Sequence, residues 1–336
     1  MLVSVILPNY NHADFLHARI DSILTQSFRN FELIILDDAS TDKSREVIAA
    51  YAEDPRVSQV LYNEKNSGSS FIQWQRGIEL AKGDYIWIAE SDDTCEPTFL
   101  GKMVDRLQSD PAIMIATCRS ANINQTGSVT SLNTWHDDGF QTDRWTRDFV
   151  NEGKNEIEQF LRFRNTIPNA SAVLFRNTIN AELKQLIDLD WKYCGDWFFW
   201  SALLLKGKIS YCSEVLSYHR HHGQTTRAVK TFDSERSRFA ETVQCVHIID
   251  STVQLPVNWK DSRYGWIHEF YTARTSFRDK FRYSYWTITT SAAFNKRLIR
   301  QASFFYIRYG KEKVRSSAGS YRPLLKNIFM RLKSKR

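Results

Sequence analysis

Three carboxylates stand within four residues at the end of an apolar run. Residues 84–89 have the composition of a buried strand, and Glu90, Asp92 and Asp93 follow them directly. Carboxylates this close raise one another's pKa unless a cation or a hydrogen-bond donor lies among them. A divalent ion that bridges protein and phosphate oxygens would meet that need. The alternative is that Asp93 or Thr94 only caps a helix that begins near residue 97.

A fourth carboxylate, Asp196, stands in the aromatic stretch 195–200. An ionised carboxylate among Trp and Phe side chains is costly unless it caps a helix or takes part in chemistry. Desolvation by these rings would raise the pKa of Asp196 and make it a better general base near neutral pH. Helix capping is the alternative, and the two roles are compatible.

Three histidines and an arginine occupy residues 219–222. They suggest a metal site, but consecutive residues on a strand point to opposite faces, so the four side chains cannot all converge. A purely structural loop is the alternative.

Alternating strands and helices must position these groups. Such alternation predicts βαβ units, a largely parallel sheet and ligand binding at the carboxyl ends of the strands. The polar clusters after the first, second and fourth strands, at residues 10–11, 37–38 and 90–93, should therefore share one cleft. Strands are expected at residues 3–7, 31–36, 57–62, 84–89, 113–117, 172–175, 209–212 and 215–218; helices at 14–25, about 42–53, 69–82, 97–108, 156–164 and from 233; and loops over 121–153.

Composition indicates a soluble globular protein of 336 residues, 42% hydrophobic and 25% charged. No apolar run is long enough to span a membrane and no secretory signal precedes the first strand, so a cytoplasmic location is expected. The five cysteines have no CxxC spacing, which argues against a disulfide framework or a zinc site.

Charge is distributed unevenly along the chain. Residues 261–336 hold 18 Lys and Arg against 4 Asp and Glu, whereas residues 1–260 hold 27 against 34. An apolar stripe at helical spacing lies in the basic tail, at Tyr321, Leu324, Leu325, Ile328, Phe329 and Leu332. Such a helix could bind an anionic membrane surface or, equally, dock on the protein itself or a second subunit, while nucleic acid is a less favoured partner.

Three segments together resemble the donor domain of family 2 glycosyltransferases, which have the GT-A fold. They are VSVILPNYN at 3–11, FELIILDDASTD at 31–42 and AKGDYIWIAESDD at 81–93. The resemblance extends to about residue 226. It implies an inverting enzyme that transfers a sugar from a nucleotide-diphosphate sugar, a UDP-sugar being favoured, to a hydroxyl of a saccharide or lipid-linked acceptor. Surface polysaccharide or lipid-linked oligosaccharide synthesis at the inner membrane face would suit the basic tail.

The resemblance also assigns roles to individual residues. Asp92 and Asp93 would hold Mn²⁺ or Mg²⁺, and Asp196 would be the catalytic base. Trp74-Gln75 stands where the family usually has Arg-Asn, and Glu90 replaces the usual first Asp of the acidic motif. Tyr10 would stack on the base and Asp38 would accept a hydrogen bond from it; Pro8, Asn66, Gly68, Glu90 and Asp92 would complete the nucleotide site, Arg220 and His221 would contact diphosphate or metal, and Asn169 the acceptor.

The expected organisation is a GT-A domain over residues 1–228, with a nucleotide-sugar half at 1–118 and an acceptor-side half at 119–228, followed by a helical basic region at 229–336. Two alternatives are a degenerate protein that binds nucleotide sugar without transfer, and a nucleotidyltransferase. The second lacks the Gly-rich phosphate loop that such an enzyme would show near the first strand.

Overall fold

The computed structural model describes residues 1–134, 140–167, 169–178, 191–223, 232–255 and 263. The chain forms two compact units, Met1–Val257 and Asn258–Arg336. Nearly all of the second unit, including the apolar stripe predicted in the basic tail at 321–332, lies outside the described residues. Within the ranges just given, no helix combines the length and hydropathy that a bilayer crossing requires.

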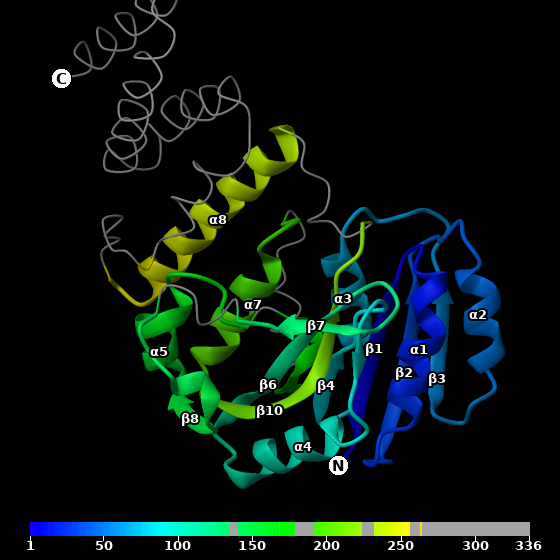
Figure 1. Cartoon of the computed structure of the whole chain (residues 1–336), viewed down its shortest axis with the longest axis horizontal. Coiled ribbons are helices and arrows are strands. Elements are labelled where there is room, and N and C mark those ends of the chain that lie inside the picture. Colours follow the sequence, from blue (N-terminus) through cyan, green and yellow to red (C-terminus); the bar gives the residue numbers. More distant parts are fainter. Residues whose placement is uncertain (135–139, 168, 179–190, 224–231, 256–262, 264–336) are drawn as a thin grey trace, which may run out of the picture. The chain divides into compact units, whose positions relative to one another are not determined.

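One ten-stranded sheet organises the first unit (Figure 1). The strands follow the order β3-β2-β1-β4-β9-β6-β10-β5, with β7 paired to β6 and β8 to β10. They are Val3–Asn9 (β1), Phe31–Asp37 (β2), Val57–Tyr62 (β3), Tyr85–Ile88 (β4), Thr94–Cys95 (β5), Ile113–Ile123 (β6), Val129–Leu132 (β7), Phe149–Glu152 (β8), Val173–Arg176 (β9) and Lys208–Arg220 (β10).

Helices connect these strands. The α-helices are Ala13–Leu24 (α1), Ser44–Tyr51 (α2), Ser70–Leu80 (α3), Phe99–Ser109 (α4), Gly153–Glu156 (α5), Gly195–Leu204 (α7) and Phe232–Thr252 (α8). Shorter turns are Arg144–Thr146 (η1), the π-helical Ile157–Leu161 (η2) and Ala170–Ala172 (η3). Helix α8 belongs to the compact unit that ends at Val257, although the sequence placed it in the C-terminal region.

The sheet lies between two helical layers because β1, β2 and β4 are apolar on both faces. Val3, Val5 and Leu7 pack in one core with buried side chains of α1, α2 and α4. The opposite face receives α3 so closely that a Cβ on Gly77 would lie 2.3 Å from Ile6. Helix α7 covers that face further along. Continuous apolar strands of this kind are what the sequence predicted for a sheet covered on both sides.

The parallel arrangement is confirmed for β3-β2-β1-β4 and becomes mixed beyond β4. Strand β9 is antiparallel to both β4 and β6, and β6 is parallel to β10. Two successive reversals make β6 and β10 run in the same direction as β4. The strands predicted at 209–212 and 215–218 are one strand, β10, whose pairing with β6 shifts register between Cys212 and Ser217.

Two further sequence predictions differ from the structure. The region 121–153 contains the end of β6, all of β7 and β8, and η1, so it is more ordered than its polar composition indicated; residues 135–139 lie outside the description. Helix α4 begins after Thr98, whose side chain makes no cap hydrogen bond, and Thr94 belongs to β5. The helix-capping alternative for Asp93 and Thr94 is therefore wrong.

Candidate active site

The carboxyl ends of four strands meet at one edge of the sheet. Asn9 of β1 is in register with Asp37 of β2, and the backbone N–H of Ala89 after β4 bonds to the carbonyl of Ile6. Because β10 runs parallel to β4, its end also reaches this edge. The antiparallel β9 contributes its beginning instead, where Ser171 accepts a hydrogen bond from the N–H of Glu90 at 3.1 Å.

The loops after β1 and β2 form the predicted base-binding part of the site. Tyr10 is 44% exposed, so its ring has room to stack on a base. Asp38 is buried, and its carboxylate accepts hydrogen bonds from Asn63, Ser67 and Gln73 at 2.6 to 3.1 Å. A base N–H would have to share these oxygens with the protein donors. Recognition of the base by Asp38 stays a prediction.

The remaining predicted nucleotide residues frame these loops. Pro8 lies inside β1, buried and in register with Leu36. Asn66 accepts the N–H of Gly68 at 2.6 Å and donates to the carbonyl of Asp38 at 3.3 Å. Gly68 has φ +78°, a conformation that favours glycine. The loop is therefore a built turn beside Asp38, and its contacts with a nucleotide stay predictions.

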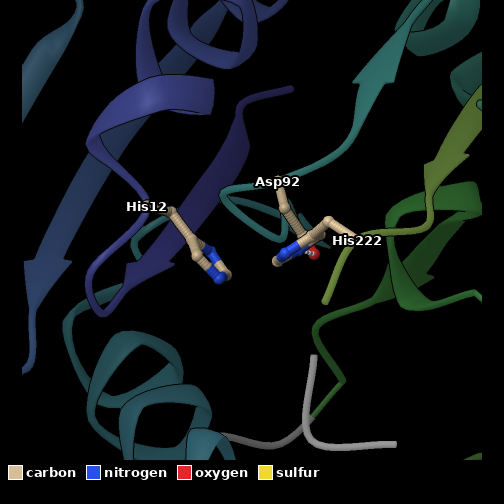
Figure 2. A group of neighbouring side chains, drawn as sticks. All are labelled: His12, Asp92 and His222. Atoms are coloured by element: carbon tan, nitrogen blue, oxygen red, sulfur yellow. Dashed lines mark hydrogen bonds and ion pairs between the residues drawn. The ribbon is translucent and has the colours of Figure 1, made fainter. Parts of the chain in front are cut away.

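Three side chains from distant parts of the chain converge beside the acidic loop (Figure 2). His12 stands at the start of α1, Asp92 after β4 and His222 after β10; one possible ligand atom from each lies within 4.8 Å of the others. Asp92 Oδ2 and His222 Nε2 are 3.0 Å apart. Ser91 Oγ bonds to Nδ1 of His12 at 2.8 Å, which fixes the ring and makes Nε2 the nitrogen available to a ligand.

This cluster fits a divalent ion. Asp92 Oδ2 and His222 Nε2, 3.0 Å apart, are close enough for one ion to contact both. A carboxylate suits Mg²⁺ or Mn²⁺, whereas two imidazoles favour the transition metal. Burial lowers the pKa of His12, which keeps its imidazole neutral, as coordination requires. The donor set therefore favours Mn²⁺.

Asp92 and Asp93 differ in their surroundings. Burial alone would raise the pKa of Asp92, but the hydrogen bond from His222 and the nearby His12 and His219 outweigh it, so that pKa is lowered. Asp93 is buried and accepts the backbone N–H of Arg220 at 2.9 Å, and burial together with the Asp92 charge raises its pKa. His12 and His222 lie beside Asp92, so this predicted metal ligand has two further candidate ligands next to it. Asp93 is not among the residues that the structure brings to the cluster, and it ties the acidic loop to β10.

Arg220 and His221, the predicted contacts of diphosphate or metal, make hydrogen bonds within the protein. The buried guanidinium of Arg220 donates to the carbonyls of Asp92, Asn124 and Gln125 at 2.6 to 3.1 Å. The exposed His221 bonds to Asn122 of β6 at 3.0 Å. Arg220 thus fastens the acidic loop to the β6–β7 turn, and His222, one residue later, is the histidine that reaches Asp92. A diphosphate contact by Arg220 or His221 stays a prediction.

Glu90 is paired with the residue that departs from the family pattern. The indole N–H of Trp74 on α3 donates to Glu90 Oε1 at 2.9 Å. Burial, followed by repulsion from Asp92, raises the pKa of Glu90 to about 8, although the Trp74 hydrogen bond opposes the rise. The two departures from the family pattern, a Trp for Arg and a Glu for Asp, therefore contact each other.

A buried cation lies beneath the acidic loop. Arg19 of α1 is fully buried, and its guanidinium carbon lies 4.8 Å from the ring centre of Trp87. Its nitrogens have no hydrogen-bond partner among the described residues. Its charge lowers the pKa of Glu90 and of Asp93 against the larger effect of burial. Arg19 is thus an internal counter-charge that limits repulsion in the acidic loop.

Asp196 occupies the second position of α7. Its carboxylate accepts the N–H of Trp197 at 2.7 Å and the amide of Asn165 at 3.0 Å. Gly195 lies against Phe71 so tightly that a Cβ there would be 2.8 Å from the ring. Phe71 in turn meets Trp74, the partner of Glu90, edge to face. The start of α3 thus joins the Asp196 segment to the acidic loop.

Asn169, the predicted acceptor contact, is a buried structural residue. Its side chain accepts the N–H of Ser171 at 2.9 Å and donates to Ser217 of β10 at 3.2 Å. It therefore holds the turn that presents Ser171 to Glu90. An acceptor contact by Asn169 is not supported by this geometry.

Sequence reasoning missed His12 and His222. A signal existed for His12, because it stands two residues after Tyr10 in the loop that follows the first strand. For His222 the signal was incomplete: alternation shows that adjacent histidines point in opposite directions, but the register of β10 decides which one faces the acidic loop.

An acidic loop and two histidines thus lie at the carboxyl edge of an α/β sheet, which is where such sheets bind ligands. Residues 4–172 match the family described as Glycosyl transferase family 2. The chain belongs to this family, so it is a glycosyltransferase with the GT-A fold.

Individual relatives agree with the family assignment. An uncharacterized glycosyltransferase of Haemophilus influenzae is 26% identical over 250 residues, 72% of either chain. The putative teichuronic acid biosynthesis glycosyltransferase TuaG of Bacillus subtilis is 36% identical over 104 residues, 31% of this chain and 41% of TuaG. A crystal structure of S. aureus TarS 1-349 in complex with UDP-GlcNAc superposes with a TM-score of 0.67 at 15% identity, covering 94% of this chain and 92% of TarS.

Proposed function

We propose that this glycosyltransferase moves a sugar from a nucleotide-diphosphate sugar, a UDP-sugar being favoured, to a hydroxyl acceptor with inversion at the anomeric carbon. The observation that carries the proposal is the convergence of His12, Asp92 and His222 at the sheet edge where the base-contacting loops also end. The fold shared with TarS, which was crystallised with UDP-GlcNAc, supports a nucleotide-sugar donor.

In the proposed reaction, Tyr10 and Asp38 hold the base, and His12, Asp92 and His222 are the residues that would hold Mn²⁺. The bound ion would offset the charge that develops on the departing diphosphate. Asp196 takes the proton from the acceptor hydroxyl as that oxygen bonds to the anomeric carbon. The bond from that carbon to the diphosphate oxygen breaks in the same displacement, and nucleoside diphosphate leaves.

The proposed acceptor is a saccharide or lipid-linked glycan of a surface polymer. Support comes from the TuaG relative, whose name refers to teichuronic acid synthesis, and from the excess of basic residues after residue 260. Residues 1–118 are proposed as the donor half and 119–228 as the acceptor-side half. Helix α8 packs with them, and the basic remainder of 229–336 is the proposed membrane or subunit contact.

A panel of nucleotide-diphosphate sugars with Mn²⁺, Mg²⁺ or EDTA tests the proposal. Release of nucleoside diphosphate with Mn²⁺ is expected, whereas release of pyrophosphate would indicate a nucleotidyltransferase. Asp196→Asn should keep the thermal shift given by UDP and Mn²⁺ but lose turnover. UDP binding by the wild type without turnover of any donor would instead indicate a degenerate binding protein.

A matched pair of histidine variants tests the metal site. His222→Ala should raise the Mn²⁺ concentration needed for half of the thermal shift by about tenfold or more, because it removes one of three proposed ligands. His221→Ala, its exposed neighbour, should keep the shift. Equal loss in both variants, or in neither, would contradict the assignment of His222.

A further inference from the structure

We propose that Glu241 of α8 positions the segment that carries Asp196, which makes α8 part of the catalytic machinery. This inference rests on the proposed role of Asp196 as the base. The Glu241 carboxylate accepts hydrogen bonds from three successive backbone N–H groups: Lys192 at 3.1 and 3.2 Å, Tyr193 at 2.6 Å and Cys194 at 3.2 Å. Cys194 is the residue from which α7 begins, and Asp196 follows two residues later.

The start of α7 is held from α8 at a second point. Cys194 supplies no side-chain cap to α7, and its sulfur lies 3.4 Å from the hydroxyl of Thr242, the neighbour of Glu241. Successive N–H groups turned towards one anion form a concave site that fixes the backbone between them. Burial raises the pKa of Glu241 and the three N–H groups lower it, so the carboxylate exchanges water for backbone donors. Glu241 therefore fixes from α8 the three backbone N–H groups that precede α7.

Helix α8 is itself fixed to the catalytic unit. Its buried residues Phe239, Val243, Val246 and Ile249 form one face. Near its end, Asp250 lies 2.7 Å from Arg162, which follows η2, and both side chains are almost fully buried. A carboxylate mounted on a helix anchored at both its apolar face and its end can hold a loop within narrow limits.

For this role, the position of the Asp196 carboxylate matters more than the charge of Glu241. Asp196 is also held by Asn165 and by the Gly195 contact with Phe71, so losing Glu241 should displace the base without removing it. A displacement of about 1 Å at a reacting group can cost about 100-fold in rate. Glu241→Ala should therefore lower kcat by about 10- to 100-fold while the KM for the donor changes less than twofold.

The test uses the full chain, Mn²⁺ and the donor that gives turnover in the panel above. Glu241→Ala is compared with Glu241→Gln, which keeps the shape but loses one acceptor, and with Gln244→Ala, an exposed change on the same helix. Hydrogen exchange of the peptide covering 191–200 provides a readout independent of turnover. Faster exchange and the kcat loss are expected in Glu241→Ala, smaller effects of the same kind in Glu241→Gln, and neither in Gln244→Ala.

The outcomes separate this inference from the proposed function. If Asp196→Asn abolishes turnover but both Glu241 variants keep wild-type kcat, or if exchange at 191–200 is unchanged, the positioning role is overturned. If Asp196→Asn keeps turnover, the proposed base and the positioning role fall together, whatever the exchange shows. Should Glu241→Ala not fold, the Glu241→Gln comparison decides by the same two readouts.

Discussion

Glu90 should make the metal-free protein less stable as the pH rises through neutrality. Its pKa is about 8 in the fold, against an ordinary value of 4.5. Between these values the unfolded chain releases the proton that the folded chain keeps. Retention of this proton by the folded chain therefore makes its full contribution to the free energy of unfolding below pH 4.5. The contribution decreases as the pH rises and is lost above about pH 8.

The size of the effect follows from the pKa difference. Each pH unit within this window changes the free energy of unfolding by about 1.4 kcal/mol, which gives about 3 kcal/mol between pH 4.5 and 7. Part of the Glu90 side chain reaches solvent, which screens its charge, so about 2 kcal/mol is a reasonable expectation. Glu90→Gln removes the ionisation and keeps an oxygen for the Trp74 indole.

Urea unfolding in EDTA at pH 4.5 and 7.5 checks this expectation. Glu90→Gln should match the wild type at pH 4.5 and exceed it by about 2 kcal/mol at pH 7.5. The control is Glu53→Gln, an exposed glutamate beyond α2, which should follow the wild type at both values. A Glu90→Gln variant that also follows the wild type at both values would refute the desolvation of Glu90 and its unfavourable ionisation.

Three other substitutions test contacts around the site. Trp74→Phe keeps an aromatic ring against Phe199 and Trp200 but removes the donor to Glu90. Because the Glu90 pKa is about 8, urea unfolding should show about 1 kcal/mol more lost at about pH 9, where Glu90 is ionised, than at about pH 6, where it is protonated; equal losses would assign the effect to packing. Gly195→Ala should cost about 1 to 3 kcal/mol in urea unfolding through its clash with Phe71, whereas Gly101→Ala, whose new Cβ would meet nothing nearer than 3.6 Å, should not destabilise. Arg162→Met leaves Asp250 buried without its cation and should lower the free energy of unfolding by about 3 to 5 kcal/mol. A double variant with Asp250→Leu should recover most of this loss. If it recovers none, the charge pair is not the cause.

The sequence predicted the donor half of the fold more closely than the site. Strands β1, β2 and β4 are continuous apolar runs that end in polar residues, so their positions and shared edge could be read directly. Strand β10 could not, because Ser213 and Glu214 interrupt the apolar pattern and only pairing with β6 shows that the strand continues past them. The same register decides that His222 and not His221 meets Asp92.

Long-range contacts explain the remaining differences. The family resemblance assigned Arg220 to the diphosphate, and it could not show that Nε and Nη1 of its guanidinium also donate to three backbone carbonyls. Asn169, which the resemblance assigned to the acceptor, also accepts the N–H of Ser171. Glu241 gave no signal at all, since its partners are backbone N–H groups nearly fifty residues earlier in the chain. Local patterns report which residues are polar, whereas tertiary pairing decides what each one contacts.

The order of the strands in the sheet has a consequence for synthesis of the protein. The strands β3-β2-β1-β4 are complete in the growing chain by residue 88, but His222 follows a strand that ends at residue 220. A ribosome must therefore translate about two-thirds of the 336 residues before His12, Asp92 and His222 can come together. Until then the acidic loop lacks both the histidine and the Arg220 backbone N–H that satisfy it. Nascent chains and fragments that stop before β10 should be unable to consume donor sugar, however well their first four strands have formed.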